Sequence, residues 1–92
     1  MQLEIVTPEA TLFSGEVQSV AVPGINGEFQ MLNNHAPIVS LLGAGNVKIY
    51  GAISLKKDIA AKFQQVDANL TLLAIQSGTI EMKDNKVIIL AD

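Results

Sequence analysis

Turn-forming residues recur about every ten residues along this chain, the rhythm of a β-sandwich or barrel. Thr7-Pro8, Pro23-Gly24-Ile25-Asn26-Gly27, Asn33-Asn34 and Gly43-Ala44-Gly45 each interrupt a short β-branched or aliphatic run. Proline and glycine there end a strand, and asparagine tolerates positive φ. The runs predicted as strands are residues 3–6, 17–22, 28–32, 37–42, 46–50, 70–75 and 79–83. The run 70–75 is apolar on both faces, so we expect it in the interior of a sheet.

A C-terminal hairpin is the most specific local prediction. Residues 79–83 alternate between apolar and polar, as a half-buried strand does. Asp84-Asn85 can adopt the positive φ angles of a two-residue type I′ turn. This turn places Met82 opposite Val87 and Ile80 opposite Ile89, so apolar side chains meet on one face.

The segment 53–66 departs from this rhythm. Leu55, Ile59, Phe63 and Val66 repeat at helical spacing, and Ser54 could cap a helix. Two lysines in the first turn would oppose the helix dipole. We therefore predict a short helix near 54–66, with an irregular hairpin as the alternative.

Composition excludes several classes of function. The chain has 92 residues, which predicts one domain, 1–92. It has no cysteine, so disulfides, thiolate zinc sites and cysteine nucleophiles are excluded. Its net charge is −3, and all six basic residues are lysines, which does not favour nucleic acid binding. No apolar run approaches the roughly 20 residues of a membrane span, so membrane association is expected only through a partner.

No residue pattern predicts catalysis, a cofactor or a metal. His35 is the only histidine and has no nucleophile or acidic partner at a suitable spacing, so we interpret it as a loop residue bonded to backbone or a subunit contact. The glycines do not form a phosphate-binding motif. Glu28 follows a glycine turn and is either a solvated edge carboxylate or an exposed charge that docks against another subunit.

Four motifs in order resemble one family. They are residues 3–9 (LEIVTPE), Leu12-Phe13-Ser14-Gly15-Glu16-Val17, Gly27-Glu28 followed by His35-Ala36-Pro37, and Gly78 with Val87 and the ending Leu90-Ala91-Asp92. Together they resemble the epsilon subunit of rotary F-type ATP synthases. The resemblance extends from Leu3 to Asp92 except for a middle segment, residues 53–69, which carries no family motif.

The resemblance implies an all-β fold, a flattened β-sandwich of two sheets with about ten short strands. It also implies a non-catalytic central-stalk subunit that links the gamma shaft to the membrane rotor ring and couples ion flow to ATP synthesis. Gamma and the ring c subunits would be partners, with alpha and beta nearby. A leaderless chain favours the cytoplasmic side of a bacterial cell membrane. By motif, the implied ring contacts are Glu28, Phe29, Gln30 and Met31, and the implied gamma contacts are Thr7, His35 and Ser40.

The chain departs from the family pattern in places. Leu32-Asn33-Asn34 replaces the family's Tyr-Pro-Gly, and asparagine can support the same turn. The sequence ends at Asp92, before the family's C-terminal helical pair, so we expect a short form without autoinhibition by helix insertion and without a nucleotide site. The alternative function is a free-standing β-sandwich adaptor that binds a protein partner through an edge strand or loop.

Overall fold

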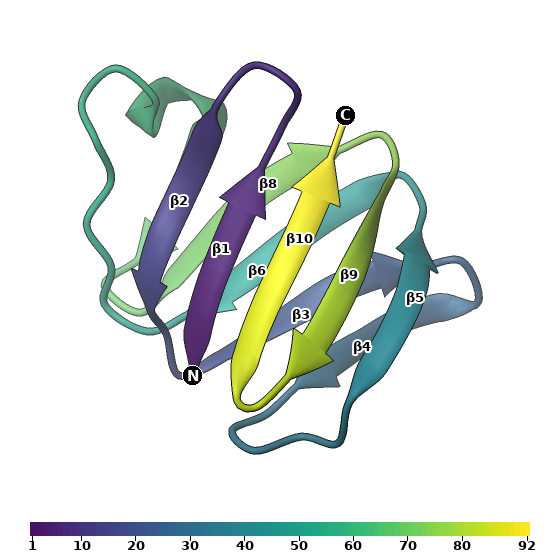
Figure 1. Cartoon of the computed structure of the whole chain (residues 1–92). Helices are drawn as coiled ribbons and strands as arrows, with labels where there is room; N and C mark the ends of the chain where they lie inside the picture. The colour runs from purple at the N-terminus through teal and green to yellow at the C-terminus, as the bar shows by residue number, and fades with distance from the viewer.

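Ten β-strands in two layers make up most of the protein (Figure 1). The structure, a computed structural model, describes all 92 residues. The elements are β1 (Gln2–Val6), β2 (Thr11–Glu16), β3 (Ser19–Gly24), β4 (Gly27–Met31), β5 (Ile38–Leu42), β6 (Gly45–Tyr50), the 3₁₀ turn η1 (Ala60–Lys62), β7 (Phe63–Asp67), β8 (Leu70–Ile75), β9 (Gly78–Lys83) and β10 (Lys86–Ala91). The structure contains no helix of the length and apolarity that a membrane crossing requires.

The two layers are parts of one curled sheet. The first layer has the order β2-β1-β10-β9-β5 and lies in front in Figure 1; β3, β4, β6, β7 and β8 form the second. All pairings are antiparallel except β1 with β10. The layers join where Gly24 pairs with Leu42, and the chain bends from β5 into β6 through residues 43–45. The predicted all-β sandwich is confirmed, with a hydrogen-bonded corner between its layers.

The bend into β6 requires glycine. Gly45 has a φ of +153°, and a Cβ at this position would lie 2.8 Å from the Cβ of Pro23. A side chain would therefore strain the backbone and also collide with β3. A bend of this kind lets one strand leave one layer and enter the other.

A single hydrophobic core lies between the layers. It contains 19 buried residues from both layers, and its largest fully buried side chains include Leu3, Ile49, Ile80, Met82 and Ile89. Alternate residues of each strand contribute, because successive side chains in a strand point to opposite faces. No buried side-chain nitrogen or oxygen lacks a hydrogen-bond partner. The core therefore gains apolar burial without the cost of unpaired polar groups.

The C-terminal hairpin has the predicted register. Asp84 and Asn85 have φ angles of +53° and +59°, as a type I′ turn requires. Val87 pairs with Met82, and Ile89 pairs with Ile80. All four paired side chains are buried, which confirms the prediction.

Two strands were not predicted. In β2, Leu12 and Phe13 are both buried, so the sequence lacks the simple alternation that indicates a strand. A register shift in the β1–β2 pairing accompanies this pattern. The second unpredicted strand, β7, is an edge strand paired only with β8. Because β8 therefore has a neighbour on each side, its predicted interior position is confirmed.

The prediction of a helix near 54–66 was wrong except for the three residues of η1. No side chain caps this turn, so Ser54 does not have the predicted role. Leu55, Ile59 and Phe63 do pack against the core, but they reach it from an irregular segment beside β2 and from the start of β7. In β7 the backbone N–H and C=O groups of residues 63–67 form hydrogen bonds through pairing with β8, whereas in a helix they would bond to one another.

Candidate interaction surface

An apolar row crosses the outer face of the first layer near the C-terminus. Register places Val6 beside Leu90, Leu90 beside Thr79, and Thr79 beside Leu41. These residues come from four strands, yet they form one continuous row. Leu41 is 60% exposed and Leu90 is 52% exposed. Apolar side chains that line up on an exposed sheet face are typical of protein contact sites.

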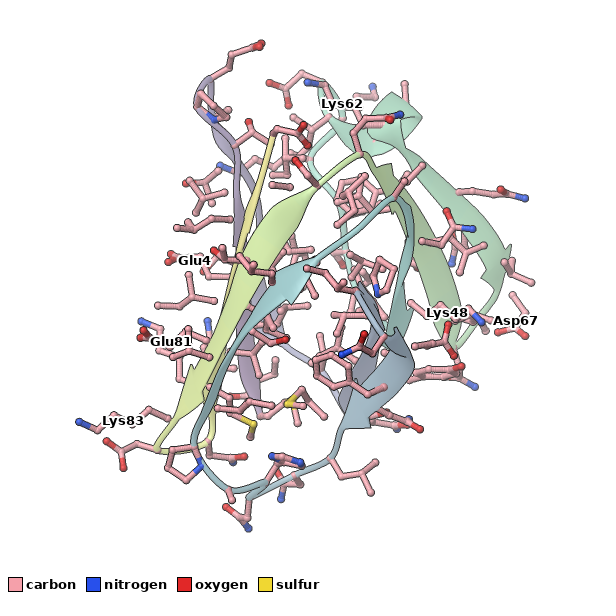
Figure 2. The ribbon with its side chains drawn as sticks, turned by 90° about the vertical axis from the view of Figure 1, so that its right-hand side faces the viewer. Glu4, Lys48, Lys62, Asp67, Glu81 and Lys83 are labelled. Atoms are coloured by element: carbon pink, nitrogen blue, oxygen red, sulfur yellow. The ribbon has the colours of Figure 1, made fainter.

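Charged rows follow on the same face. The next row contains Glu4, Ile88, Glu81 and Val39, and Figure 2 shows Glu4 and Glu81 projecting outward from this layer. At the hairpin end of the layer, Lys86 pairs with Lys83. We call this surface of an apolar, an acidic and a basic row the banded face.

The charges of the banded face have no partners within the protein. The structure has two salt bridges, Met1 with Glu16 and Lys48 with Glu28, and neither involves the banded face. Lysines directly opposite each other on paired strands repel. An acidic group from another molecule would relieve this repulsion between Lys83 and Lys86. The face is thus electrostatically suited to an oriented partner.

A shallow groove of about 660 Å³ adjoins the apolar row. We call it the Thr7 groove; its residues are Val6, Thr7, Pro8, Ile25, Leu41, Leu42, Ser77, Gly78, Thr79, Leu90, Ala91 and Asp92. The Thr7 hydroxyl donates to the Ala10 carbonyl at 3.2 Å and accepts from the Ala10 N–H at 3.3 Å, which closes the β1–β2 turn. The Thr7 side chain therefore shapes one wall of the groove.

Asp92 and Ser77 shape the other end of the Thr7 groove. The Ser77 N–H donates to Asp92 Oδ1 at 3.0 Å, and the Asp92 N–H donates to the Ser77 carbonyl at 3.4 Å. Hydrogen bonding from the Ser77 side chain, followed by its backbone N–H, lowers the pKa of Asp92 below its ordinary value. The end of β10 is thus fastened to the β8–β9 turn.

A second groove of about 600 Å³ lies on the other side of Ile25 and Leu41. This Glu28 groove is lined by Gly24, Ile25, Asn26, Gly27, Glu28, Phe29, Val39, Ser40 and Leu41. Glu28 Oε1 lies 3.0 Å from Lys48 Nζ, and this hydrogen bond, together with the charge of Glu28, raises the pKa of Lys48. Glu28 is half-exposed, so it is a paired rather than a fully free carboxylate.

The four residues predicted to contact the ring do not share one face. Glu28 and Gln30 are exposed, whereas Phe29 is half-buried and Met31 is completely buried in the core. Gln30 donates from Nε2 to the Ser19 hydroxyl at 3.0 Å. Period-2 alternation along β4 separates the two pairs. Only Glu28 and Gln30 therefore present their side chains outward, and Met31 acts by supporting β4 from inside.

The three residues predicted to contact gamma are also separated. Thr7 lies in the β1–β2 turn and His35 lies in the β4–β5 loop, at opposite ends of the molecule (Figure 1). Ser40 lies on β5 in the Glu28 groove, so one predicted gamma residue shares a groove with a predicted ring residue. His35 Nδ1 donates to the Ala36 carbonyl at 2.7 Å, so His35 is a loop residue bonded to backbone, as expected.

Sequence reasoning missed the apolar row itself. Val6, Leu41 and Leu90 are unremarkable aliphatic residues in separate strands, and only the register between distant strands brings them together. No three His, Cys, Asp or Glu side chains come together as metal ligands. The arrangement can bind other macromolecules through shape, apolar area and ordered charge.

These features define the protein as a β-sandwich domain. Its sequence places it in a specific family: the profile of the ATP synthase Delta/Epsilon chain, beta-sandwich domain, matches residues 1–92, and the chain belongs to this family. The family assignment agrees with the prediction of a non-catalytic subunit.

Curated relatives carry the name ATP synthase epsilon chain. The relative from Leptospira interrogans is 36% identical over all 92 residues, and the chain spans 61% of that protein's length. The relative from Chlorobaculum tepidum is 39% identical over 90 residues, 98% of this chain and 86% of the relative. A chain from the central stalk and c-ring of the Tetrahymena thermophila mitochondrial ATP synthase has the same fold, with a TM-score of 0.74 and 14% identity over 98% of this chain and 61% of that chain.

Proposed function

We propose that this chain is a non-catalytic central-stalk subunit of a rotary ATP synthase that links the gamma shaft to the membrane rotor ring. In this role it couples ion flow to ATP synthesis and is held peripherally on the cytoplasmic side of a bacterial cell membrane. The observation that carries the proposal is the banded face, because a stiff sandwich with an apolar row and unpaired charges is suited to a lasting protein contact.

Gamma is the partner we assign to the banded face and the Thr7 groove. Burial of Leu41 and Leu90 would supply the apolar centre of this contact. Beyond that centre, gamma would present basic groups to Glu4 and Glu81 and acidic groups to Lys83 and Lys86. This order of charges gives the contact one orientation, as torque transmission requires.

The rotor ring is the partner we assign to the exposed side of β4. Glu28 and Gln30 project from this strand, and Phe29 lines the groove beside them. The Glu28–Lys48 pair keeps the carboxylate at the edge of the groove, where it can accept hydrogen bonds from polar ring loops. Met31 anchors the strand to the core.

The free edge of β7 favours a second function, that of an adaptor. Residues 64–67 are exposed, and β7 pairs only with β8, so an extended peptide could add to this edge. An adaptor of this kind would act without other synthase subunits.

Affinity purification from solubilised membranes tests the proposal. A tagged copy expressed in its own cell should recover alpha, beta, gamma and the ring subunit in fixed proportions. Replacing Leu41 with Asp in the same tagged copy should sharply reduce that recovery. Recovery of a clean monomer from the soluble fraction, with none of those subunits, would overturn the stalk assignment and support the adaptor.

A further inference from the structure

The β4–β5 loop and the β9–β10 turn are joined by one side chain. The Asn34 N–H donates to Asn85 Oδ1 at 2.8 Å, and Asn85 Nδ2 donates to Asn33 Oδ1 at 2.9 Å. These contacts link residues 51 and 52 positions apart in the sequence. In Figure 1 the hairpin turn and the loop meet at the end of the molecule opposite the C-terminus. We call the loop, residues 32–37, the His35 loop.

The geometry of Asn85 allows it to serve the turn and the loop together. Its φ of +59° belongs to the type I′ turn, and Asn34 has a similar φ of +60°. Asparagine occupies this region more easily than other residues that have a side chain. The amide of Asn85 uses its oxygen for Asn34 and its nitrogen for Asn33, so both ends of the group are engaged.

The His35 loop has little else to hold it. All six of its residues are exposed, and the apolar side chain of Leu32 is 56% exposed. Its internal hydrogen bonds are the His35 N–H to the Leu32 carbonyl at 3.0 Å and His35 Nδ1 to the Ala36 carbonyl at 2.7 Å. Neither of these bonds ties the loop to the body of the sandwich. The Asn85 amide does so.

We propose that Asn85 is a positioning residue that holds the His35 loop in the shape that gamma binds. The inference rests on the proposed function, because gamma is the partner assigned to the banded face beside this loop and the motif resemblance implies His35 as a gamma contact. The apparent affinity of a loop for its partner falls when only a fraction of the molecules have the binding conformation. A loop that is already held in that conformation avoids this loss. We call the two hydrogen bonds of the Asn85 amide the Asn85 clamp. The adjacent Lys83–Lys86 pair belongs to the same end of the banded face, so the clamp also holds the loop beside the basic row.

Asn85→Gly removes the clamp and keeps the turn. Asp-Gly is among the most favoured pairs for a type I′ turn, so the hairpin should form as before. Asn85→Asp is the matched conservative variant, because it keeps an acceptor for the Asn34 N–H and loses the donor to Asn33. Asn34→Gly is a control that keeps the positive φ and the N–H donor at position 34.

Amide hydrogen exchange decides whether the clamp exists. In Asn85→Gly, exchange of the Asn34 N–H should become at least about tenfold faster, and exchange in β9 and β10 should be unchanged. Asn85→Asp should restore most of the protection at Asn34. An Asn34 amide that exchanges at the same rate in wild type and Asn85→Gly would overturn the clamp.

Affinity for the purified gamma subunit decides the positioning role. We expect Asn85→Gly to weaken binding about three- to tenfold, and Asn34→Gly and Asn85→Asp to weaken it less. Unchanged affinity in Asn85→Gly, while Leu41→Asp abolishes binding, would overturn the positioning role and leave the stalk assignment intact. A wild-type chain that does not bind gamma would overturn both, and the exchange rates would still decide the clamp.

Discussion

Leu41 offers the sharpest test of the banded face because it lines both grooves. Complete burial of a leucine side chain is worth about 1.5–3 kcal/mol. Since 60% of Leu41 is exposed in the free domain, a partner that covers it would gain about 1–2 kcal/mol. Leu41→Ala removes most of that area, so the dissociation constant for gamma should rise by about fivefold, or about 1 kcal/mol.

The same substitution should barely affect folding. Leu41→Ala removes the buried part of the leucine side chain, which lowers the free energy of unfolding by about 1 kcal/mol or less. A typical domain is stabilised by roughly 5–15 kcal/mol, so the variant should remain folded. Titration calorimetry with purified gamma gives the affinity, and thermal unfolding gives the stability. Val66→Ala is the matched control: Val66 is 51% exposed, but it lies on β7 at an edge of the second layer.

Two results would refute this reasoning. If Leu41→Ala binds gamma as tightly as wild type, gamma does not cover the apolar row. If Val66→Ala weakens binding as much as Leu41→Ala, the contact includes the β7 edge. The second result would move the proposed gamma surface from the banded face to the second layer.

Three further predictions concern packing, charge and pH. Gly78→Ala should destabilise the domain by about 3 kcal/mol in denaturant unfolding, because a Cβ there would collide with the backbone oxygen of Leu90 in β10. Gly43→Ala, with open space around it, should be nearly neutral. Glu28→Lys should lower the pKa of Lys48 in an NMR titration and weaken coupling of ion flow to ATP synthesis in membranes; unchanged coupling in the assembled complex would remove Glu28 from the ring contact. Hydrogen bonding from Ser77 keeps the pKa of Asp92 below its ordinary value of 3.8, so its stabilising contribution is present above pH 3.8 and is lost as pH falls through the lower folded-state pKa. A protection factor for amide exchange at the β8–β9 turn that stays constant through that window would contradict this.

Of the candidate surfaces, only the exposed side of β4 could be predicted from the sequence. The glycine turn before Glu28 correctly predicted an exposed carboxylate at a strand start. Alternation along β4 could have separated Phe29 and Met31 from Glu28 and Gln30, since side chains of one strand alternate between faces. The motif resemblance treated these four residues as a group because a motif records order and not direction.

Features that depend on neighbouring residues could be predicted from the sequence alone. Asp84-Asn85 allows the positive φ angles of the turn, and the alternation beside it specifies one register, so the hairpin follows from local chemistry. The strand rhythm likewise identified the fold class. In residues 53–66 local spacing was misleading, because apolar residues at helical intervals can also reach a core from an irregular segment and an edge strand.

The pairing of strands that are distant in the sequence is visible only in the folded structure. The parallel pairing of β1 with β10 brings Val6 beside Leu90, and the corner at Gly24 and Leu42 turns β5 into the first layer. The banded face and the Asn85 clamp both depend on these long-range registers. Local propensity carries no information about such pairings, because they are selected by the packing of the whole core and by the pairing of backbone groups across it.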